Sequence, residues 1–205
     1  MAKVEHYYTQ FEEGYFYHIY NCTIDKKLMF KNDGNYQFFL RKFTQYLNGV
    51  LEIYSYCLLP NHFHFLIRVV DNLSDYKSTN KILDTTPVHE IVSKQLRIFF
   101  QSYALAFNKQ HERSGTLFQT PFKRALVHDN DYITQLIYYI NSNPQKHKIV
   151  RDFREWKWSS YQSIILDEPN TLKKNEVIDW FGGINEYIDF HNNGKFLLNA
   201  NFVIE

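Results

Sequence analysis

The sequence predicts an α+β fold, in which one antiparallel sheet is covered by long helices. Short stretches rich in aromatic and β-branched residues alternate with longer stretches whose apolar residues recur at helical spacing. Hydrophobic residues make up 44% of the 205 residues, which is enough for a sizeable core in one globular domain. The order in which the two patterns occur then defines the expected topology.

The first half of the chain is predicted to form a strand, a helix and two further strands, over residues 15–23, 35–48, 50–59 and 62–70. Asp33 is the expected N-cap of the helix, because its carboxylate can accept a hydrogen bond from a free backbone amide of the first turn. Only Pro60 and Asn61 separate the last two strands, which predicts an antiparallel hairpin.

The second half begins with a polar segment, residues 71–87, which is predicted to be a loop. A long helix, a strand and a shorter helix are predicted after it, over residues 88–110, 122–127 and 132–143. Pro144 is expected to end the shorter helix, because proline has no backbone N–H to donate. The first six elements follow the ferredoxin-like order β-α-β-β-α-β, with both helices on one face of an antiparallel sheet.

Residues 1–165 are predicted to form one domain, and residues 166–205 a short, mainly helical C-terminal extension. The formal net charge is only +1, so any basic surface for a nucleic acid must be local. No apolar run is long enough to span a bilayer, and the N-terminus has no apolar signal core. A cytoplasmic protein without a membrane partner is therefore expected, with Cys22 and Cys57 as free thiols.

His62 and His64 are the most informative residues of the third predicted strand. Because side chains alternate along a strand, the two imidazoles point to one face and Phe63 to the other. Two imidazoles one pleat apart can coordinate a single metal ion. The alternative is structural, with each ring satisfied by a hydrogen-bond partner.

Tyr139 and Asn143 form a second polar pair, four residues apart and therefore on one face of the last predicted helix. The Asn143 amide oxygen is a possible neutral metal ligand, and the Tyr139 phenol a possible nucleophile if a nearby cation or base favours the phenolate. Packing and helix termination before Pro144 are the alternatives. Tyr138 competes with Tyr139, but consecutive helix residues are turned about 100° apart, and only Tyr139 shares a face with Asn143.

Basic residues also cluster in the long helix and in the strand after it. The candidate DNA contacts are Lys94, Arg97, Arg113, Lys123 and Arg124. Such cations can contact phosphates while neighbouring aromatic rings stack on bases. For any single one of them, an ordinary solvated surface is the alternative.

Four segments in a fixed order carry a family resemblance: residues 59–64, 103–118, 139–144 and 158–161. The first contains Pro60-Asn61-His62-Phe63-His64, which matches the pattern Pro-Asn-His-hydrophobic-His. Together these segments resemble the single-tyrosine HUH transposases, and most closely the REP-associated tyrosine transposase branch. The resemblance covers roughly residues 15–163.

The resemblance implies a mechanism. His62 and His64 would bind Mg²⁺ or Mn²⁺, with Asn143 as the third ligand. Tyr139 would attack a phosphodiester of single-stranded DNA, leaving a 5′-phosphotyrosine link and a free 3′-hydroxyl that can later be rejoined. The implied partner is single-stranded DNA with hairpin or repeat structure, bound by a monomer or a homodimer.

Two other functions fit the same residues. One is an HUH replication initiator, which would differ in its DNA partner. The other is a domesticated DNA-binding module that keeps the fold and has lost strand transfer. The chain also departs from its relatives in being nearly neutral, with acidic residues concentrated after Ser163.

Overall fold

The computed structural model describes residues 8–127, 130–166 and 171–194. The strands are β1 (Phe16–Cys22), β2 (Leu51–Leu59), β3 (His62–Val69) and β4 (Lys123–Val127). The helices and 3-10 turns are η1 (Ile24–Lys26), α2 (Asp33–Leu47), α3 (Ser74–Thr79), α4 (Val88–Gln110), α5 (Asn130–Lys146), η2 (Phe153–Glu155), α6 (Ser160–Ile165), α7 (Lys174–Phe181) and α8 (Ile184–Asn193). Within these ranges, no helix is both long and apolar enough to cross a membrane.

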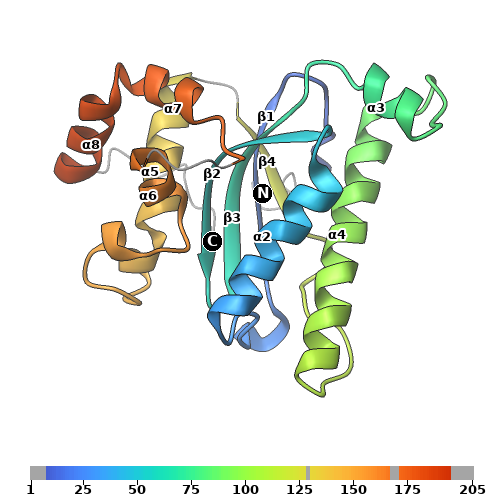
Figure 1. Cartoon of the computed structure of the whole chain (residues 1–205), viewed down its shortest axis with the longest axis horizontal. Coiled ribbons are helices and arrows are strands. Elements are labelled where there is room, and N and C mark those ends of the chain that lie inside the picture. The colour runs from blue at the N-terminus through green and yellow to red at the C-terminus, as the bar shows by residue number, and fades with distance from the viewer. Residues whose placement is uncertain (1–7, 128–129, 167–170, 195–205) are drawn as a thin grey trace.

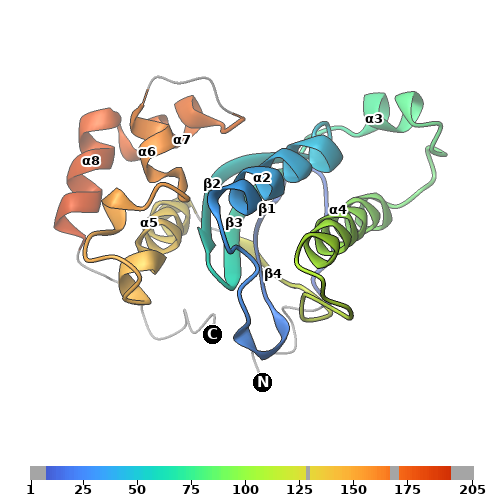
Figure 2. The same cartoon turned by 60° about the horizontal axis from the view of Figure 1, so that its bottom comes forward.

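The four strands form one antiparallel sheet in the order β2-β3-β1-β4. β3 is an inner strand, and its residue His62 pairs with Cys22 of β1 and Leu59 of β2. α2 and α4 lie on one face of the sheet, and α5 to α8 lie on the other (Figures 1 and 2). The predicted β-α-β-β-α-β order, the antiparallel sheet and the shared face of the first two long helices are therefore confirmed.

Each face of the sheet has its own hydrophobic core. Under α2 and α4 the core is aromatic: the ring of Phe39 lies 5.2 Å from that of Phe63 on β3 and 4.8 Å from that of Phe99 on α4. Burying one such side chain contributes about 1.5–3 kcal/mol. The second core joins Leu66 of β3 to Ile137 of α5 and to the C-terminal helices. β3 thus carries both cores, one on each side.

Two local predictions in the first 90 residues are wrong. The N-cap of α2 is Asn32 rather than Asp33, and the Asn32 side chain accepts a hydrogen bond from the Asn35 amide at 3.1 Å. The polar segment 71–87 is not an unbroken loop, because it contains α3. The Asn72 side chain accepts from the Ser74 amide at 2.7 Å just where this helix begins. Such short-range polar bonds leave no apolar periodicity in the sequence.

Pro144 does not end α5, which continues to Lys146. Proline leaves the carbonyl of Ile140 without its usual backbone donor. The side-chain Nδ2 of Asn143 lies 3.5 Å from that carbonyl and donates at 2.8 Å to the carbonyl of Tyr139. A side-chain amide therefore compensates for the missing N–H, and the helix passes through the proline.

The described part of residues 166–205 contains α7 and α8, and both pack into the core beside α5. Tyr187 of α8 is fully buried there. The division into a domain and an extension stays a prediction, and residues 195–205 of that extension lie outside the described residues.

Candidate functional site

The paired histidines lie on the sheet face that α5 covers. His64 is 2% exposed and His62 is half-buried, whereas Phe63 between them points into the aromatic core under α2 and α4. This is the alternation predicted for the strand. Phe63 therefore packs in the aromatic core, whereas His62 and His64 lie on the opposite face of β3.

His64 is held by residues of the neighbouring strand β1. Its Nδ1 lies 3.0 Å from Nε2 of His18, and the two rings are stacked 5.2 Å apart. Burial, together with the neighbouring imidazoles of His18 and His62, lowers the pKa of His64 well below its ordinary value. His64 is therefore neutral near pH 7, which is the form that binds metals. Its Nε2 is buried and has no hydrogen-bond partner among the described residues.

His62 has a comparable neighbour in Asn61. The Nδ1 atom of His62 lies 2.7 Å from the Asn61 side-chain oxygen. Beyond the ring, His147 packs against His62 with ring centroids 4.7 Å apart. His147 follows α5 directly, and its amide donates to the carbonyl of Asn143 at 2.9 Å, so it continues the helical turn.

α5 brings Tyr139 and Asn143 to the histidines. The ring of Tyr139 lies edge-on to His64 with centroids 5.8 Å apart. Because Tyr139, Asn143 and His147 follow at intervals of four residues, they lie on one face of the helix. Tyr139 contacts His64, and His147 contacts His62. Along the chain, Asn143 therefore lies one helical turn from each of these two contacts.

The donor set fits a divalent ion. The Oδ1 atom of Asn143 and the Nε2 atom of His64 are both buried without a hydrogen-bond partner in the described part of the chain. Leaving a buried polar atom unsatisfied costs about 1–3 kcal/mol, so a ligand here would be favourable. The described residues contain no group of three or more His, Cys, Asp or Glu side chains arranged for a metal. A site at this place therefore depends on the amide of Asn143 as its third donor, beside His62 and His64.

Tyr138 points away from this site. Its ring packs against Phe190 and His191 of α8, at centroid distances of 6.0 Å and 5.5 Å. Tyr139, 2% exposed, faces His64 instead. The geometry therefore favours Tyr139 as the candidate nucleophile, as its shared face with Asn143 predicted.

Three residues near the site had no assigned role from the sequence. His18 contacts His64, His147 contacts His62, and the ammonium of Lys146 lies 4.9 Å from the ring centroid of Tyr139. Lys146 is a cation of the kind that a phenolate nucleophile needs nearby. The spacing of four residues after Asn143 could have indicated His147, whereas the contact of His18 depends on strand pairing.

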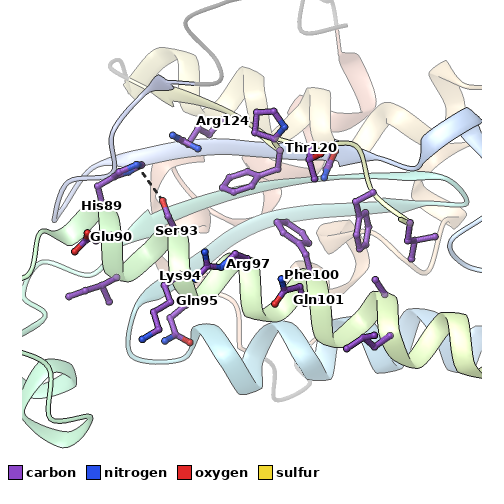
Figure 3. A pocket seen from close by; sticks show the side chains of 18 of the residues that line it. His89, Glu90, Ser93, Lys94, Gln95, Arg97, Phe100, Gln101, Thr120 and Arg124 are labelled. Atoms are coloured by element: carbon purple, nitrogen blue, oxygen red, sulfur yellow. Dashed lines mark hydrogen bonds between the residues drawn. The ribbon is translucent and has the colours of Figure 1, made fainter. Parts of the chain in front are cut away.

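A groove of about 1370 Å³ lies on the other face of the sheet, between α4 and the segment that precedes β4. Figure 3 shows Lys94, Arg97 and Phe100 on α4, with Arg124 on the opposite wall. Lys94 and Arg97 are exposed, and Phe100 is partly exposed. This wall therefore combines positive charge with an aromatic surface.

The other predicted DNA contacts are Arg113, Lys123 and Arg124, and they lie in different places. Arg124 is 7% exposed, and its guanidinium is hydrogen-bonded to the Thr9 carbonyl, so it serves mainly the protein itself. Arg113 bonds to Asn108 at 2.6 Å and closes the turn after α4. Lys123 lies on the opposite sheet face, with its ammonium 5.5 Å from the ring centroid of Tyr20. The basic residues thus form no single patch.

Paired histidines on a central strand lie near a tyrosine on a helix, which is the arrangement that the sequence resemblance implies. No family model matches the chain. A Haemophilus influenzae protein that carries the name REP-associated tyrosine transposase is 27% identical over 117 residues, which are 57% of this chain and 62% of that relative. A solved REP-associated tyrosine transposase bound to a REP hairpin has a TM-score of 0.53 and 15% identity, over 77% of this chain and 82% of the other. The predicted resemblance to REP-associated tyrosine transposases is confirmed.

Proposed function

We propose that this protein is a transposase-type endonuclease that cleaves and rejoins single-stranded DNA through Tyr139. The observation that carries the proposal is the position of α5, which holds Tyr139 against His64 and is followed by His147 against His62, with Asn143 one helical turn from each. The similarity to REP-associated tyrosine transposases supports it. Because Tyr139 and His64 are buried, a phosphodiester can reach them only when the site opens.

The proposed reaction transfers a backbone phosphate of the DNA to Tyr139, and later from Tyr139 to a 3′-hydroxyl. The Tyr139 phenolate oxygen attacks phosphorus, the bond to the 3′-oxygen breaks, and that oxygen takes up a proton to become a free hydroxyl. In the reverse step a 3′-hydroxyl attacks the phosphotyrosine and releases Tyr139. One phosphoester bond replaces another each time, so ATP is not required.

The residues of the site have separate proposed roles. Mg²⁺ or Mn²⁺, held by His62, His64 and Asn143, would supply positive charge to a non-bridging phosphate oxygen and to the leaving 3′-oxygen. Lys146 would favour the phenolate form of Tyr139. The edge-on packing of Tyr139 against His64 restricts the ring and so limits the positions of its hydroxyl.

The proposed substrate is single-stranded DNA with a hairpin, since the solved structural relative binds a REP hairpin. Lys123 lies on the same sheet face as the histidines and is placed to contact phosphates near the scissile bond. The α4 groove, with Lys94 and Arg97, would bind a flanking part of the same DNA. Two contact surfaces on opposite faces require the DNA to pass around an edge of the sheet.

A covalent adduct is the test. The chain is incubated with labelled hairpin oligonucleotides and Mn²⁺, and denaturing gels reveal protein-linked DNA. We expect an adduct with the native chain and with Tyr138→Phe, and none with Tyr139→Phe. An undiminished adduct in Tyr139→Phe would refute the assignment of the nucleophile.

A DNA-binding module without activity is the second candidate. The burial of Tyr139 favours it, because the hydroxyl is not presented to solvent. Hairpin binding without metal-dependent cleavage by the native chain would support this candidate over the transposase.

A further inference from the structure

In both histidines of the pair, the ring nitrogen Nδ1 is engaged by a neighbouring side chain. His62 Nδ1 lies 2.7 Å from the oxygen of Asn61, and His64 Nδ1 lies 3.0 Å from Nε2 of His18. We propose that Asn61 and His18 are positioning residues that fix both histidines as Nδ1–H tautomers. Both rings then present the lone pair of Nε2 to one divalent ion. The inference rests on the proposed metal site.

The orientation of the Asn61 amide determines the tautomer of His62. Asn61 Nδ2 donates to the backbone carbonyl of Lys26 at 3.1 Å, so its Oδ1 is the atom that faces His62. An amide oxygen can only accept a hydrogen bond. The proton between the two side chains therefore belongs to His62 Nδ1, and the lone pair of the neutral ring is at Nε2.

The direction of the bond between His18 and His64 follows from the other nitrogen of His64. Two neutral imidazoles can share a proton in either sense, so the 3.0 Å separation alone does not fix the donor. Nε2 of His64 is buried without a hydrogen-bond partner among the described residues. A metal on this nitrogen requires its lone pair, so the proposed metal site selects the sense in which the shared proton lies on Nδ1 of His64. His64 Nδ1 therefore donates and His18 Nε2 accepts.

The surroundings of both positioning residues also restrict them. Asn61 occupies the short turn between β2 and β3, where its backbone carbonyl accepts from the Thr23 amide at 2.9 Å. His18 is fully buried on β1, and its ring stacks on Tyr20 with centroids 4.9 Å apart. Tyr20 in turn pairs directly with His64 across the strands. Neither positioning residue can turn away without breaking several contacts.

The expected effect is on metal affinity. Partners that orient a ligating histidine and fix its tautomer typically change metal affinity by about 10–100-fold when they are removed. In most such sites the acceptor is a carboxylate, a carbonyl or water. Here one acceptor is an imidazole rather than a carboxylate, so it adds no negative charge to the site.

Mn²⁺ binding by the full chain tests the role of His18. The paramagnetic resonance signal of the free ion measures how much Mn²⁺ remains unbound. His18→Phe keeps a ring but has no acceptor, and we expect its Mn²⁺ affinity to fall by about 10–100-fold. His18→Gln restores an acceptor, so its Mn²⁺ affinity should stay within about threefold of the native chain, a change smaller than the lower end of that range. The thermal unfolding midpoints of both variants establish that they are folded.

His64→Ala separates failure of this inference from failure of the metal site. If His64→Ala loses Mn²⁺ while His18→Phe binds as tightly as the native chain, the metal site stands and the positioning role is refuted. If the native chain shows no Mn²⁺ binding that depends on His64, both are refuted.

The tautomers can also be measured without any substitution. Long-range proton–nitrogen NMR correlations of the native chain with Mg²⁺ added report which nitrogen of each imidazole carries the proton. We expect Nδ1 for His62 and for His64. A proton on Nε2 of either ring would overturn the inference, even if His18→Phe does not fold.

Discussion

A buried polar network ties α5 to α8 and to the start of α6. Asn141 donates to the Tyr187 hydroxyl at 3.1 Å, its Nδ2 lies 3.2 Å from Nε2 of His191, and its Oδ1 accepts from Ser160 at 2.8 Å. His191 is 2% exposed. Because Asn141 follows Tyr139 by two residues, this network restricts the rotation of the helix that directs Tyr139 toward the sheet.

Acid should weaken this network through His191. Burial, opposed by the bond between its Nδ1 and the Tyr187 carbonyl, lowers the pKa of His191 from 6.5 to about 4. Above pH 6.5 neither the folded nor the unfolded state is protonated at this residue, so it makes no difference to stability. Between these two pKa values only the unfolded state takes up the proton, which lowers the free energy of unfolding by about 1.4 kcal/mol per pH unit. Over the whole interval the loss is roughly 3 kcal/mol, and below pH 4 it grows no further.

Urea denaturation at intervals between pH 7 and pH 4 measures this effect. The native chain should lose roughly 3 kcal/mol more stability over the range than His191→Gln, which cannot titrate there. Tyr187→Phe is the matched control, because it removes the hydroxyl partner of Asn141 and keeps the imidazole. It should be less stable at every pH by about 1 kcal/mol and retain the native pH dependence. An unchanged pH dependence in His191→Gln would show that His191 is not the group that titrates.

Three further outcomes are expected. Phe39→Ala should lower the free energy of unfolding by about 3–5 kcal/mol in urea denaturation, because the ring is fully buried, and a loss below about 1 kcal/mol would contradict its place in the core. Lys94→Ala combined with Arg97→Ala should weaken hairpin DNA binding and reduce the slope of log affinity against log salt by roughly 1.5. An unchanged slope would exclude the α4 groove as a DNA contact. Lys146→Gln should slow adduct formation about tenfold in single-turnover kinetics, equivalent to about 1.4 kcal/mol, since it removes the cation beside Tyr139. Equal rates would show that this cation does not assist the nucleophile.

Periodicity explains what the sequence alone could predict. The alternation around Phe63 placed His62 and His64 on one face, and the spacing of four residues placed Tyr139 beside Asn143. Both relations lie within one element, where the geometry of a strand or a helix is fixed. The six-element order also followed from such local patterns.

Relations between elements were not accessible in the same way. His18 reaches His64 through the register of β1 against β3, and His147 reaches His62 through the packing of α5 on the sheet. Neither register nor packing can be derived from spacing in a single sequence. Pro144 was misjudged for a related reason, since a neighbouring side chain replaces its missing donor.

Lys123 and Arg124 show a prediction that the sequence could have refined. Both belong to the basic cluster that the sequence predicts, yet adjacent residues on a strand point to opposite faces. The structure places Lys123 on the face of the histidine pair and Arg124 in the groove beside α4. Strand alternation alone was sufficient to separate them.

In the proposed reaction, Tyr139 becomes linked to the 5′-phosphate of cleaved DNA. Protease digestion of the adduct formed with Mn²⁺ and a hairpin oligonucleotide, followed by tandem mass spectrometry, locates the modified residue directly. We expect a nucleotide phosphate on Tyr139 and an unmodified Tyr138 in the same peptide. A phosphate on Tyr138 or on any other residue would contradict it.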